Sequence, residues 1–456
     1  MLEQSQPPAV SIPMPTLPMS AEPIKAADDG GLLGTVSFGA LEYLNGYAGV
    51  FIIGFLVTLI ATPFVRKLAI EMDIVDKPNE ARKQHKYPIA YLGGFAVFLG
   101  VMAAIAYSYA IIDGPGGTLG PVPLSIVIGI VAITFTGLAD DAWGWDPRLK
   151  IAGQLVAAAA LAVQDIGTRV AEGVLAPVFG EPQTVLFTLG PLALQSGDVF
   201  YWSGTAIIAI FVLGGCNAMN LIDGLDGLCS GTAAIMATGL LAISLLMAAG
   251  MQITDPFESL AGVRIVLCLA LLGAVLGFLP WNFNPAIIFL GDCGSLLIGY
   301  LIVVSILLLG ERGDTHLVFA GLIIFSLPIM DTALAILRRK LAGVPMSTAD
   351  ANHIHHIVKR AVGGVKRAVV VLYGISIAFG ILGVVLGALA IEQIVRLRIL
   401  YSVSIVLFGA IGAVALKVAL RSRWASQSGL VPVEPAPAVQ VDPVPSATSA
   451  ATQPKP

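Results

Sequence analysis

Charged residues are scarce in this sequence. Only 12% of its 456 residues are Asp, Glu, Lys or Arg, and 57% are hydrophobic. Soluble domains carry about 25% charge, so the composition excludes an ordinary soluble domain and places the chain in a lipid bilayer. The net charge of −4 gives no reason to expect nucleic acid or another polyanion as a partner. The four cysteines lie in or beside apolar runs without paired spacing, which predicts buried thiols rather than disulfides or zinc ligands.

Long apolar runs are abundant instead. A membrane-crossing helix needs about 20 apolar residues. The sequence therefore predicts an all-α polytopic membrane protein with about eleven transmembrane helices, near residues 46–66, 90–111, 122–139, 150–164, 201–221, 230–250, 263–280, 294–310, 317–337, 369–391 and 398–420. Residues 46–420 form the expected membrane domain. The segments 1–45 and 421–456, rich in Pro or in Pro, Ala and Ser, are predicted to be disordered extensions.

Basic residues are distributed unevenly between the two sets of loops. Fifteen Lys and Arg residues flank one set of span ends, and five flank the other. The positive-inside rule puts the first set in the cytoplasm, which predicts an outer N-terminus and an inner C-terminus. Residues 165–200 then form a small outer loop, and its β-prone run Thr184–Leu189 indicates a hairpin.

Four polar groups occur at different span ends, and all four fall on the predicted cytoplasmic face. They are Asp140-Asp141, Asn217–Asp226, Gly291–Ser295 and His353–His356. Solvated loops on either face of the membrane could each carry one such polar group without any function. Because none of the four groups faces outward, we expect them to converge on one site.

The run Asn217–Asp226 is the most informative of these groups. Asn217, Asn220 and Asp223 are three residues apart, so their side chains form one polar stripe at the end of a helix. Glycines at positions 224 and 227 let the backbone turn away from that helix. Amide and carboxylate oxygens in this arrangement suit a hard divalent cation or a phosphorylated, hydroxyl-rich ligand.

The other acidic groups allow two interpretations each. Asp140 and Asp141 are either an acidic helix end or a pair whose repulsion is relieved by a cation or a proton. Asp292, between two glycines and just before a span, is either a helix cap or a ligand-binding carboxylate.

Three of the five histidines lie within four residues, in a basic loop. His353, His355 and His356 are either part of a solvated loop or, beside Lys and Arg, a phosphate-binding patch. Zinc binding is disfavoured because no cysteine or carboxylate completes a tetrahedral set. A second basic element on the same face contains Arg82, Lys83, His85 and Lys86.

These groups combine hard oxygen ligands, anion-binding cations and a membrane boundary. Such a combination predicts a reaction between two phosphate-bearing molecules, one soluble and one lipid-bound. Two unit charges 4 Å apart at an effective dielectric near 20 repel each other by about 4 kcal/mol, and Mg²⁺ with basic side chains relieves this repulsion. An ion-coupled transporter is the rival class, but transporters place ionisable groups near mid-membrane rather than at span ends.

The motifs closely resemble those of the polyprenyl-phosphate N-acetylhexosamine-1-phosphate transferases, glycosyltransferase family 4, over residues 46–420. The resemblance rests on Arg82-Lys83-Gln84-His85 with Pro88 and Gly93-Gly94, Asp140-Asp141 with Lys150 and Gln154, Asn217–Leu228, Phe289–Ser295, and His353–His356. The histidine motif is interrupted by Ile354, as in the branch that transfers N-acetylglucosamine-1-phosphate. In the phospho-N-acetylmuramoyl-pentapeptide transferase branch, the alternative assignment, the three histidines are consecutive.

The resemblance implies transfer of an N-acetylhexosamine-1-phosphate from a UDP-sugar to undecaprenyl phosphate, with release of UMP, at the cytoplasmic face of a bacterial inner membrane. It implies Mg²⁺ (or Mn²⁺) at Asn220 and Asp292. The implied catalytic residues are Asp140, Asp141, Asp223 and Asp226. The implied substrate-binding residues are His85, Lys150, Asn217, Arg338, His353, His355 and His356. The expected partners are the two substrates, the bilayer and, in a homodimer, a second copy of the chain.

Overall fold

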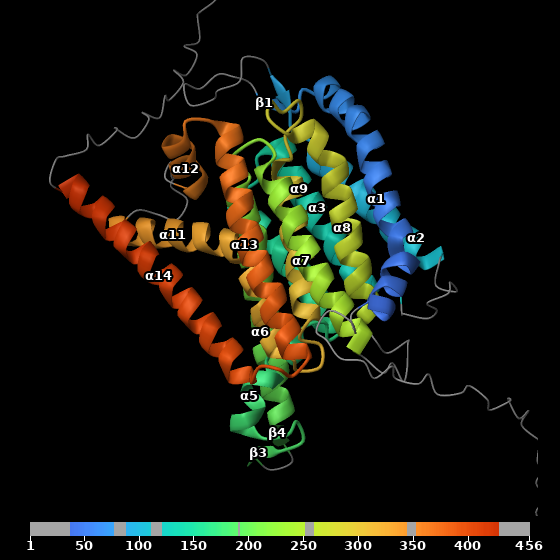
Figure 1. Ribbon diagram of the computed structural model, residues 1–456, viewed down its shortest axis with the longest axis vertical. Helices are drawn as coiled ribbons and strands as arrows, with labels where there is room; N and C mark the ends of the chain where they lie inside the picture. The colour runs from blue at the N-terminus through green and yellow to red at the C-terminus, as the bar shows by residue number, and fades with distance from the viewer. Residues whose placement is uncertain are drawn as a thin grey trace, which may run out of the picture.

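The structure is a computed structural model that describes residues 37–76, 88–110, 121–189, 192–250, 260–343 and 353–427. These residues form a helical bundle with a small β-hairpin at one end (Figure 1). Nine of the described helices are long and apolar enough to cross a membrane, which makes the chain a multi-pass membrane protein. They are α1 (Ser37–Glu71), α2 (Gly93–Ala110), α3 (Leu124–Trp143), α6 (Ser196–Ile222), α7 (Leu228–Gly250), α8 (Ala261–Asn282), α9 (Gly291–Leu308), α13 (Val365–Ile391) and α14 (Leu397–Gln427).

The predicted span 150–164 corresponds to α4 (Pro147–Val163), whose 17 residues make it shorter than these nine helices. Its first turn carries Lys150, which lies 2.8 Å from Asp140 at the end of α3. Just beyond its far end, Thr168 packs against Gly204 near the start of α6. At 1.5 Å per residue α4 is about 25 Å long, so it connects the two ends of the bundle despite its length.

The predicted span 317–337 is wrong as a single helix. It consists of α10 (Thr315–Ile324) and α11 (Ser326–Ala342), which meet at a bend of 76°. Pro328 lies in the first turn of α11, where a missing N–H costs nothing. The same proline cannot continue the hydrogen-bond ladder of α10, because its ring clashes with the carbonyl four residues earlier. Counting the pair as one span gives ten candidate spans among the described residues, against the expected eleven.

Helix α9 lies at the centre of the bundle, and 94% of its 18 residues are buried. Glycines let three neighbours approach its first half closely. A Cβ at Gly94 of α2 would lie 2.0 Å from the Gly294 nitrogen, and one at Gly137 of α3 would lie 2.5 Å from the Cys293 Cα. Further along, a Cβ at Gly299 would lie 2.6 Å from a backbone oxygen of α6. The small residues therefore bring the polar ends of α3 and α6 against the start of α9.

The expected outer hairpin is confirmed as a local structure. Strands β3 (Val185–Leu189) and β4 (Leu192–Gln195) pair antiparallel, with Thr188 opposite Ala193. Two short helices precede the hairpin, η1 (Thr168–Val170) and α5 (Glu172–Phe179). Figure 1 shows the hairpin at the lower end of the bundle, away from α12 (Ile354–Val362) and β1 (Val75–Asp76). Strand β1 pairs with β2 (Ile89–Ala90) near the upper end.

The cysteine prediction is confirmed, since Cys216, Cys229, Cys268 and Cys293 are all free and buried. Helix α1 begins at Ser37, inside the segment expected to be a disordered extension, and α14 continues to Gln427. Residues 1–36 and 428–456 lie outside the described part of the chain.

Candidate active site

Asp292, in the first turn of α9, is the centre of a polar cluster. Its Oδ1 accepts a hydrogen bond of 2.6 Å from Asn220 Nδ2, and its Oδ2 forms an ion pair with Lys150 Nζ. The same ammonium group lies 2.8 Å from Asp140 Oδ2. One cation on α4 thus joins carboxylates from α3 and α9, while the last turn of α6 supplies an amide.

The two adjacent carboxylates of α3 have different surroundings. Asp140 contacts Lys150, whereas Asp141 accepts backbone N–H groups of Asp292 at 2.8 Å and Cys293 at 2.9 Å. Asp141 therefore caps the N-terminus of α9, where the helix dipole favours a negative charge. Neither alternative considered for Asp141 from the sequence included this capping of α9, a helix far along the chain.

The amide stripe of α6 links three helices. Asn217 Nδ2 donates to Gln154 Oε1 on α4 at 2.9 Å, and Asn220 Nδ2 also lies 3.0 Å from Ser295 Oγ on α9. Asn217 is thus one turn away from the acidic cluster and holds α4 against α6. These contacts place Asn217 between helices and leave Asn220 at the cluster itself.

Asp223 follows the stripe at the C-terminal end of α6. Burial raises the pKa of its carboxyl to about 8, and the nearby charges of Asp292, Asp141 and Asp226 act in the same direction. Within the described part of the chain, no donor hydrogen-bonds to this carboxylate. The carboxyl is therefore mostly protonated near pH 7, and a cation beside it would favour the charged form.

A cavity of about 190 Å³ lies beside Asp223. Its lining residues are Tyr91, Asp223, Gly224, Leu225, Asp226, Asn282, Phe289 and Gly291. The rings of Tyr91 and Phe289 meet edge to face, with centroids 5.8 Å apart. The cavity thus combines aromatic surface with carboxylate and amide groups, which is typical of a small-molecule site.

Asp226, expected to be catalytic, anchors one wall of this cavity. Its Oδ2 accepts hydrogen bonds from Asn284 Nδ2 at 2.8 Å and from the Ala286 nitrogen at 3.0 Å. Asn282 Oδ1 accepts from the Gly227 nitrogen at 3.1 Å. The loop after α8 and the turn after α6 are thereby held together around the cavity.

The histidine motif begins helix α12 rather than lying in a solvated loop. Asp331 of α11 is buried, its Oδ1 accepts from the Ile354 nitrogen at 2.7 Å, and its Oδ2 lies 3.1 Å from His353 Nδ1. Asp331 therefore caps α12 and orients the first histidine. The contact joins residues 22 positions apart, from α11 to the residue before α12, so no local sequence pattern predicts it.

His355 packs against the turn that follows α6. Burial lowers the pKa of its imidazole to about 3, and the neighbouring His356 charge acts in the same direction. The ring is therefore neutral near pH 7 and can donate a hydrogen bond to a phosphate oxygen without carrying charge. His356 lies beside it, with ring centroids 4.2 Å apart. Arg338 on α11 is buried, and His85 lies outside the described residues.

Because Gly224 has no side chain, the His355 ring can pack against it, and this contact can be tested. A Cβ at Gly224 would lie 2.2 Å from His355 Nε2, so Gly224→Ala must displace the imidazole. We expect the variant to insert and fold but to lose at least about 10-fold in kcat/KM, because placement errors near 1 Å are costly in catalysis. The measurement is steady-state kinetics alongside a melting curve. Gly214→Ala on α6, where a Cβ meets nothing within 4 Å, is the matched control and should behave as wild type. Wild-type kinetics in Gly224→Ala would show that His355 has no part in turnover.

Among the lining residues that were not predicted as site residues, Tyr91, Asn282 and Phe289 carry aromatic or amide groups. Tyr91 precedes the Gly93-Gly94 pair, Asn282 is the last residue of α8, and Phe289 begins the Phe289–Ser295 motif. Tyr91 and Phe289 therefore lie in or beside motifs noted in the sequence, but only the fold brings all three residues to Asp223. For those two, proximity to the motifs was the available signal.

The oxygen donors near Asp292 suit Mg²⁺. This ion is usually held by one or two protein carboxylates, with water and substrate phosphates completing its shell. Asp292 and Asp223 are carboxylates that influence each other electrostatically, and the Asn220 amide lies beside Asp292, to which its Nδ2 donates. The described residues contain no ready-made cage of three or more His, Cys, Asp or Glu ligands. The residues present therefore fit an ion that is shared with a phosphorylated substrate.

Comparison with known proteins identifies the family. The model of glycosyl transferase family 4 matches residues 123–310, which contain α3, α6, α9 and the acidic cluster. A Bacillus subtilis (strain 168) protein named Probable undecaprenyl-phosphate N-acetylglucosaminyl 1-phosphate transferase is 33% identical over 338 residues, 74% of this chain and 84% of that protein. The Decaprenyl-phosphate N-acetylglucosaminephosphotransferase of Mycobacterium tuberculosis (strain ATCC 25618 / H37Rv) is 33% identical over 371 residues, 77% of this chain and 85% of its own.

A third relative extends the comparison. The Undecaprenyl-phosphate alpha-N-acetylglucosaminyl 1-phosphate transferase of Escherichia coli (strain K12) is 30% identical over 333 residues, 71% of this chain and 79% of that protein. The fold and the site define a multi-pass membrane protein with an acidic cluster at one end of its helices. This chain belongs to glycosyl transferase family 4, and the three relatives are named as polyprenyl-phosphate N-acetylglucosamine-1-phosphate transferases.

Proposed function

We propose that the protein transfers N-acetylglucosamine-1-phosphate, or a related N-acetylhexosamine-1-phosphate, from a UDP-sugar to undecaprenyl phosphate and releases UMP. The names of three relatives, which cover more than two thirds of this chain, support this activity. The observation that carries it is the convergence of Asp292, Asn220, Lys150 and Asp140 at one membrane boundary, beside the cavity at Asp223.

The reaction exchanges one phosphoanhydride for another. A phosphate oxygen of the lipid attacks the sugar-bearing β-phosphorus, and the bond from that phosphorus to the bridging oxygen breaks. UMP leaves with the electron pair of that bond. The second pKa of a phosphate monoester is about 6, so the lipid phosphate is mostly a dianion near pH 7 and needs no protein base. Asp140 is therefore proposed to position Lys150 rather than to remove a proton.

The chain's own residues have distinct parts in this scheme. Lys150, held between Asp140 and Asp292, offsets negative charge where the phosphates meet. His355 and His356 donate hydrogen bonds to the diphosphate of the donor. Asp141 holds the N-terminus of α9, whose dipole faces the same region.

Asp292, Asn220 and Asp223 would hold Mg²⁺, which supplies charge neutralisation between donor and acceptor phosphates when bound. We expect chelation with EDTA to abolish UMP release and added Mg²⁺ or Mn²⁺ to restore it. The measurement is UMP release by purified protein before and after chelation. Near-normal turnover in excess EDTA would contradict the metal assignment.

The cavity at Asp223 suits the nucleoside of the donor. A nucleobase is planar and combines polar edges with apolar faces, which matches the Tyr91 and Phe289 rings beside Asn282 and Asp226. With the base there, the diphosphate would extend toward Asp292. By the positive-inside rule this end of the bundle faces the cytoplasm, where UDP-sugars are made. We place the protein in a bacterial inner membrane accordingly.

A donor panel separates the proposed function from its alternatives. Purified protein with undecaprenyl phosphate should release UMP from UDP-N-acetylglucosamine, and at least about 10-fold more slowly from UDP-N-acetylmuramoyl-pentapeptide. The reverse order would assign the chain to the pentapeptide branch. Absence of acceptor-dependent UMP release from every UDP-sugar would favour the ion-coupled transporter.

The order of the steps can be tested without lipid. In a single displacement both substrates are bound together, so labelled UMP should not exchange into UDP-N-acetylglucosamine when acceptor is rigorously removed. A two-step route through an aspartyl-phosphate at Asp223 or Asp226 would permit that exchange. Lipid-free exchange at a rate near turnover would therefore contradict direct attack but leave the transferase activity intact.

A further inference from the structure

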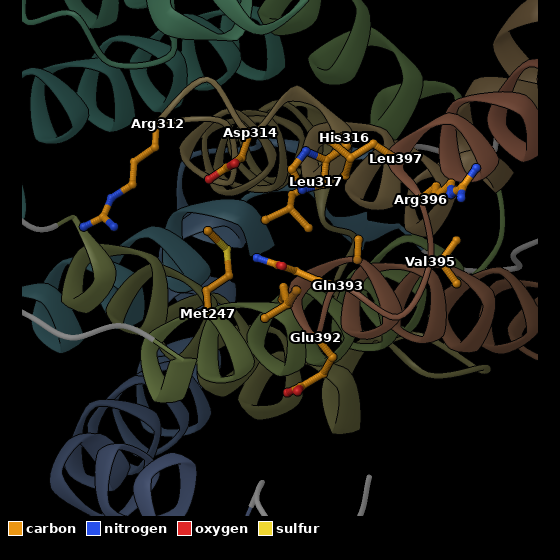
Figure 2. A pocket seen from close by; sticks show the side chains of 12 residues that line it. Met247, Arg312, Asp314, His316, Leu317, Glu392, Gln393, Val395, Arg396 and Leu397 are labelled. Carbon is orange, nitrogen blue, oxygen red and sulfur yellow. The ribbon is translucent and has the colours of Figure 1, made fainter. Parts of the chain in front are cut away.

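A cavity of about 850 Å³, whose lining side chains are drawn in Figure 2, lies beyond the C-terminal ends of α9 and α13. The length of α9 gives the separation between the cavity and the candidate active site. This helix begins at Gly291 beside the acidic cluster, and its 18 residues end at Leu308. At 1.5 Å per residue this is about 27 Å, close to the roughly 30 Å of a bilayer core. The cavity therefore lies at the opposite membrane boundary, and the proposed reaction does not use it.

One wall of the cavity is the connection between α9 and α10, which carries Arg312 and Asp314. This connection is held on both sides. Glu311 Oε2 lies 3.0 Å from Nη1 of the buried Arg264, and Thr315 Oγ1 donates at 2.8 Å to a backbone oxygen of η1. The wall is thus anchored to α8 and η1 before any ligand arrives.

The facing wall is the turn between α13 and α14, and Gln393 occupies its tightest position. Its φ of 55° is left-handed, where glycine is usually found. The Gln393 nitrogen bonds to the Ala390 oxygen at 3.1 Å and the Ile394 nitrogen to the Leu389 oxygen at 3.0 Å, the pattern of a Schellman motif. Figure 2 shows the Gln393 side chain extending into the cavity. A glycine here would avoid this strain but would leave no side chain in the cavity.

The cavity presents charged side chains of both signs; among them Asp314 acts electrostatically on His316, and Arg312 acts on the neighbouring Glu311. Among the described residues, none of its polar side chains forms an ion pair or a side-chain hydrogen bond, namely Arg312, Asp314, His316, Glu392, Gln393 and Arg396. Figure 2 shows Arg312 and Arg396 on opposite sides of the cavity, with Asp314 and His316 between them. Apolar side chains, including Met247, Leu317 and Leu397, complete the lining.

We propose that this cavity binds the headgroup of a zwitterionic phospholipid, a phosphodiester joined to a protonated amine, from the leaflet opposite the active site. Arginine side chains suit the phosphate, and carboxylates suit the ammonium group. The lining contains two arginines and two carboxylates, Asp314 and Glu392. An anionic headgroup would bind the arginines but would offer no positive charge to the carboxylates. The apolar side chains of the lining would contact the first methylenes of the acyl chains. A soluble ligand without acyl chains would leave these side chains exposed to water.

The test is native mass spectrometry of the full chain, delipidated in detergent and titrated with phosphatidylethanolamine or phosphatidylglycerol. We expect one saturable site with at least about 10-fold preference for phosphatidylethanolamine. Asp314→Asn and Arg396→Gln should each weaken this binding about 10-fold. Arg398→Gln, two residues further on in the first turn of α14 but outside the lining, is the matched control and should bind as wild type.

Gln393→Gly separates binding from stability, because the two effects have opposite signs. Glycine relieves the left-handed backbone, so the melting temperature should rise, while loss of the amide should weaken phosphatidylethanolamine binding. Equal affinity for both lipids, or wild-type binding by all three lining variants, would overturn the inference. Equally tight binding of soluble glycerophosphoethanolamine would overturn the lipid as occupant.

Discussion

Asp292→Asn should reduce turnover by at least about 10²-fold while the protein stays folded. The substitution removes the charge that pairs with Lys150 and that would hold the metal, but it keeps an oxygen that can accept from Asn220. Asp141 caps α9 through backbone N–H groups, which the substitution leaves in place. The measurement is acceptor-dependent UMP release, with a melting curve to establish that the helices remain packed.

Glu71→Gln makes the same chemical change at the end of α1, where the side chain is 62% exposed and lies 3.8 Å from Lys67. This control should retain wild-type turnover. If Asp292→Asn also retains it, the cluster at the start of α9 is structural and the proposed metal site is wrong.

The second large effect is expected at the histidines. His356→Ala should lower kcat/KM for the UDP-sugar by about 10- to 10²-fold, because a hydrogen bond to a charged group contributes about 1.5–3 kcal/mol. His355→Ala should lose at least as much, since it also removes a buried ring that packs against Gly224. Initial rates over a range of donor concentrations measure both effects.

The two histidine variants also differ in a way that checks the structure. His356 is only half-buried, so its loss should leave the melting temperature nearly unchanged, whereas His355→Ala should lower it. Lys359→Ala, one turn further along α12, separates a specific role of the imidazoles from a general loss of positive charge. Wild-type donor kinetics in both histidine variants would show that the start of α12 does not contact substrate.

The spans and the polar stripe could be predicted because each depends on local spacing. Hydropathy identified most spans, and the three-residue interval of Asn217, Asn220 and Asp223 identified a helix face. The bend between α10 and α11 at Phe325 was not predicted. The mean hydropathy of a span hardly changes when one of its residues is a proline such as Pro328.

The interactions of Asp141, Asp226 and Asp331 could not be predicted from local sequence. Asp141 caps a helix 151 positions away, and Asp226 anchors a loop 58 positions away. Asp331 of α11 orients a histidine 22 positions away, at the start of α12. A carboxylate near a span end has the same local sequence whether it binds a ligand or caps a helix. Of these three contacts, the one at Asp141 depends on the glycines that pack α3 closely against α9.

The central claim is that a sugar and its phosphate move together from nucleotide to lipid. The direct measurement uses UDP-N-acetylglucosamine labelled at the β-phosphorus, undecaprenyl phosphate and purified protein. The account predicts that the label enters the lipid fraction in step with sugar, while unlabelled UMP is released in equal amount. Sugar in the lipid without the label, or label left in released UDP, would contradict it.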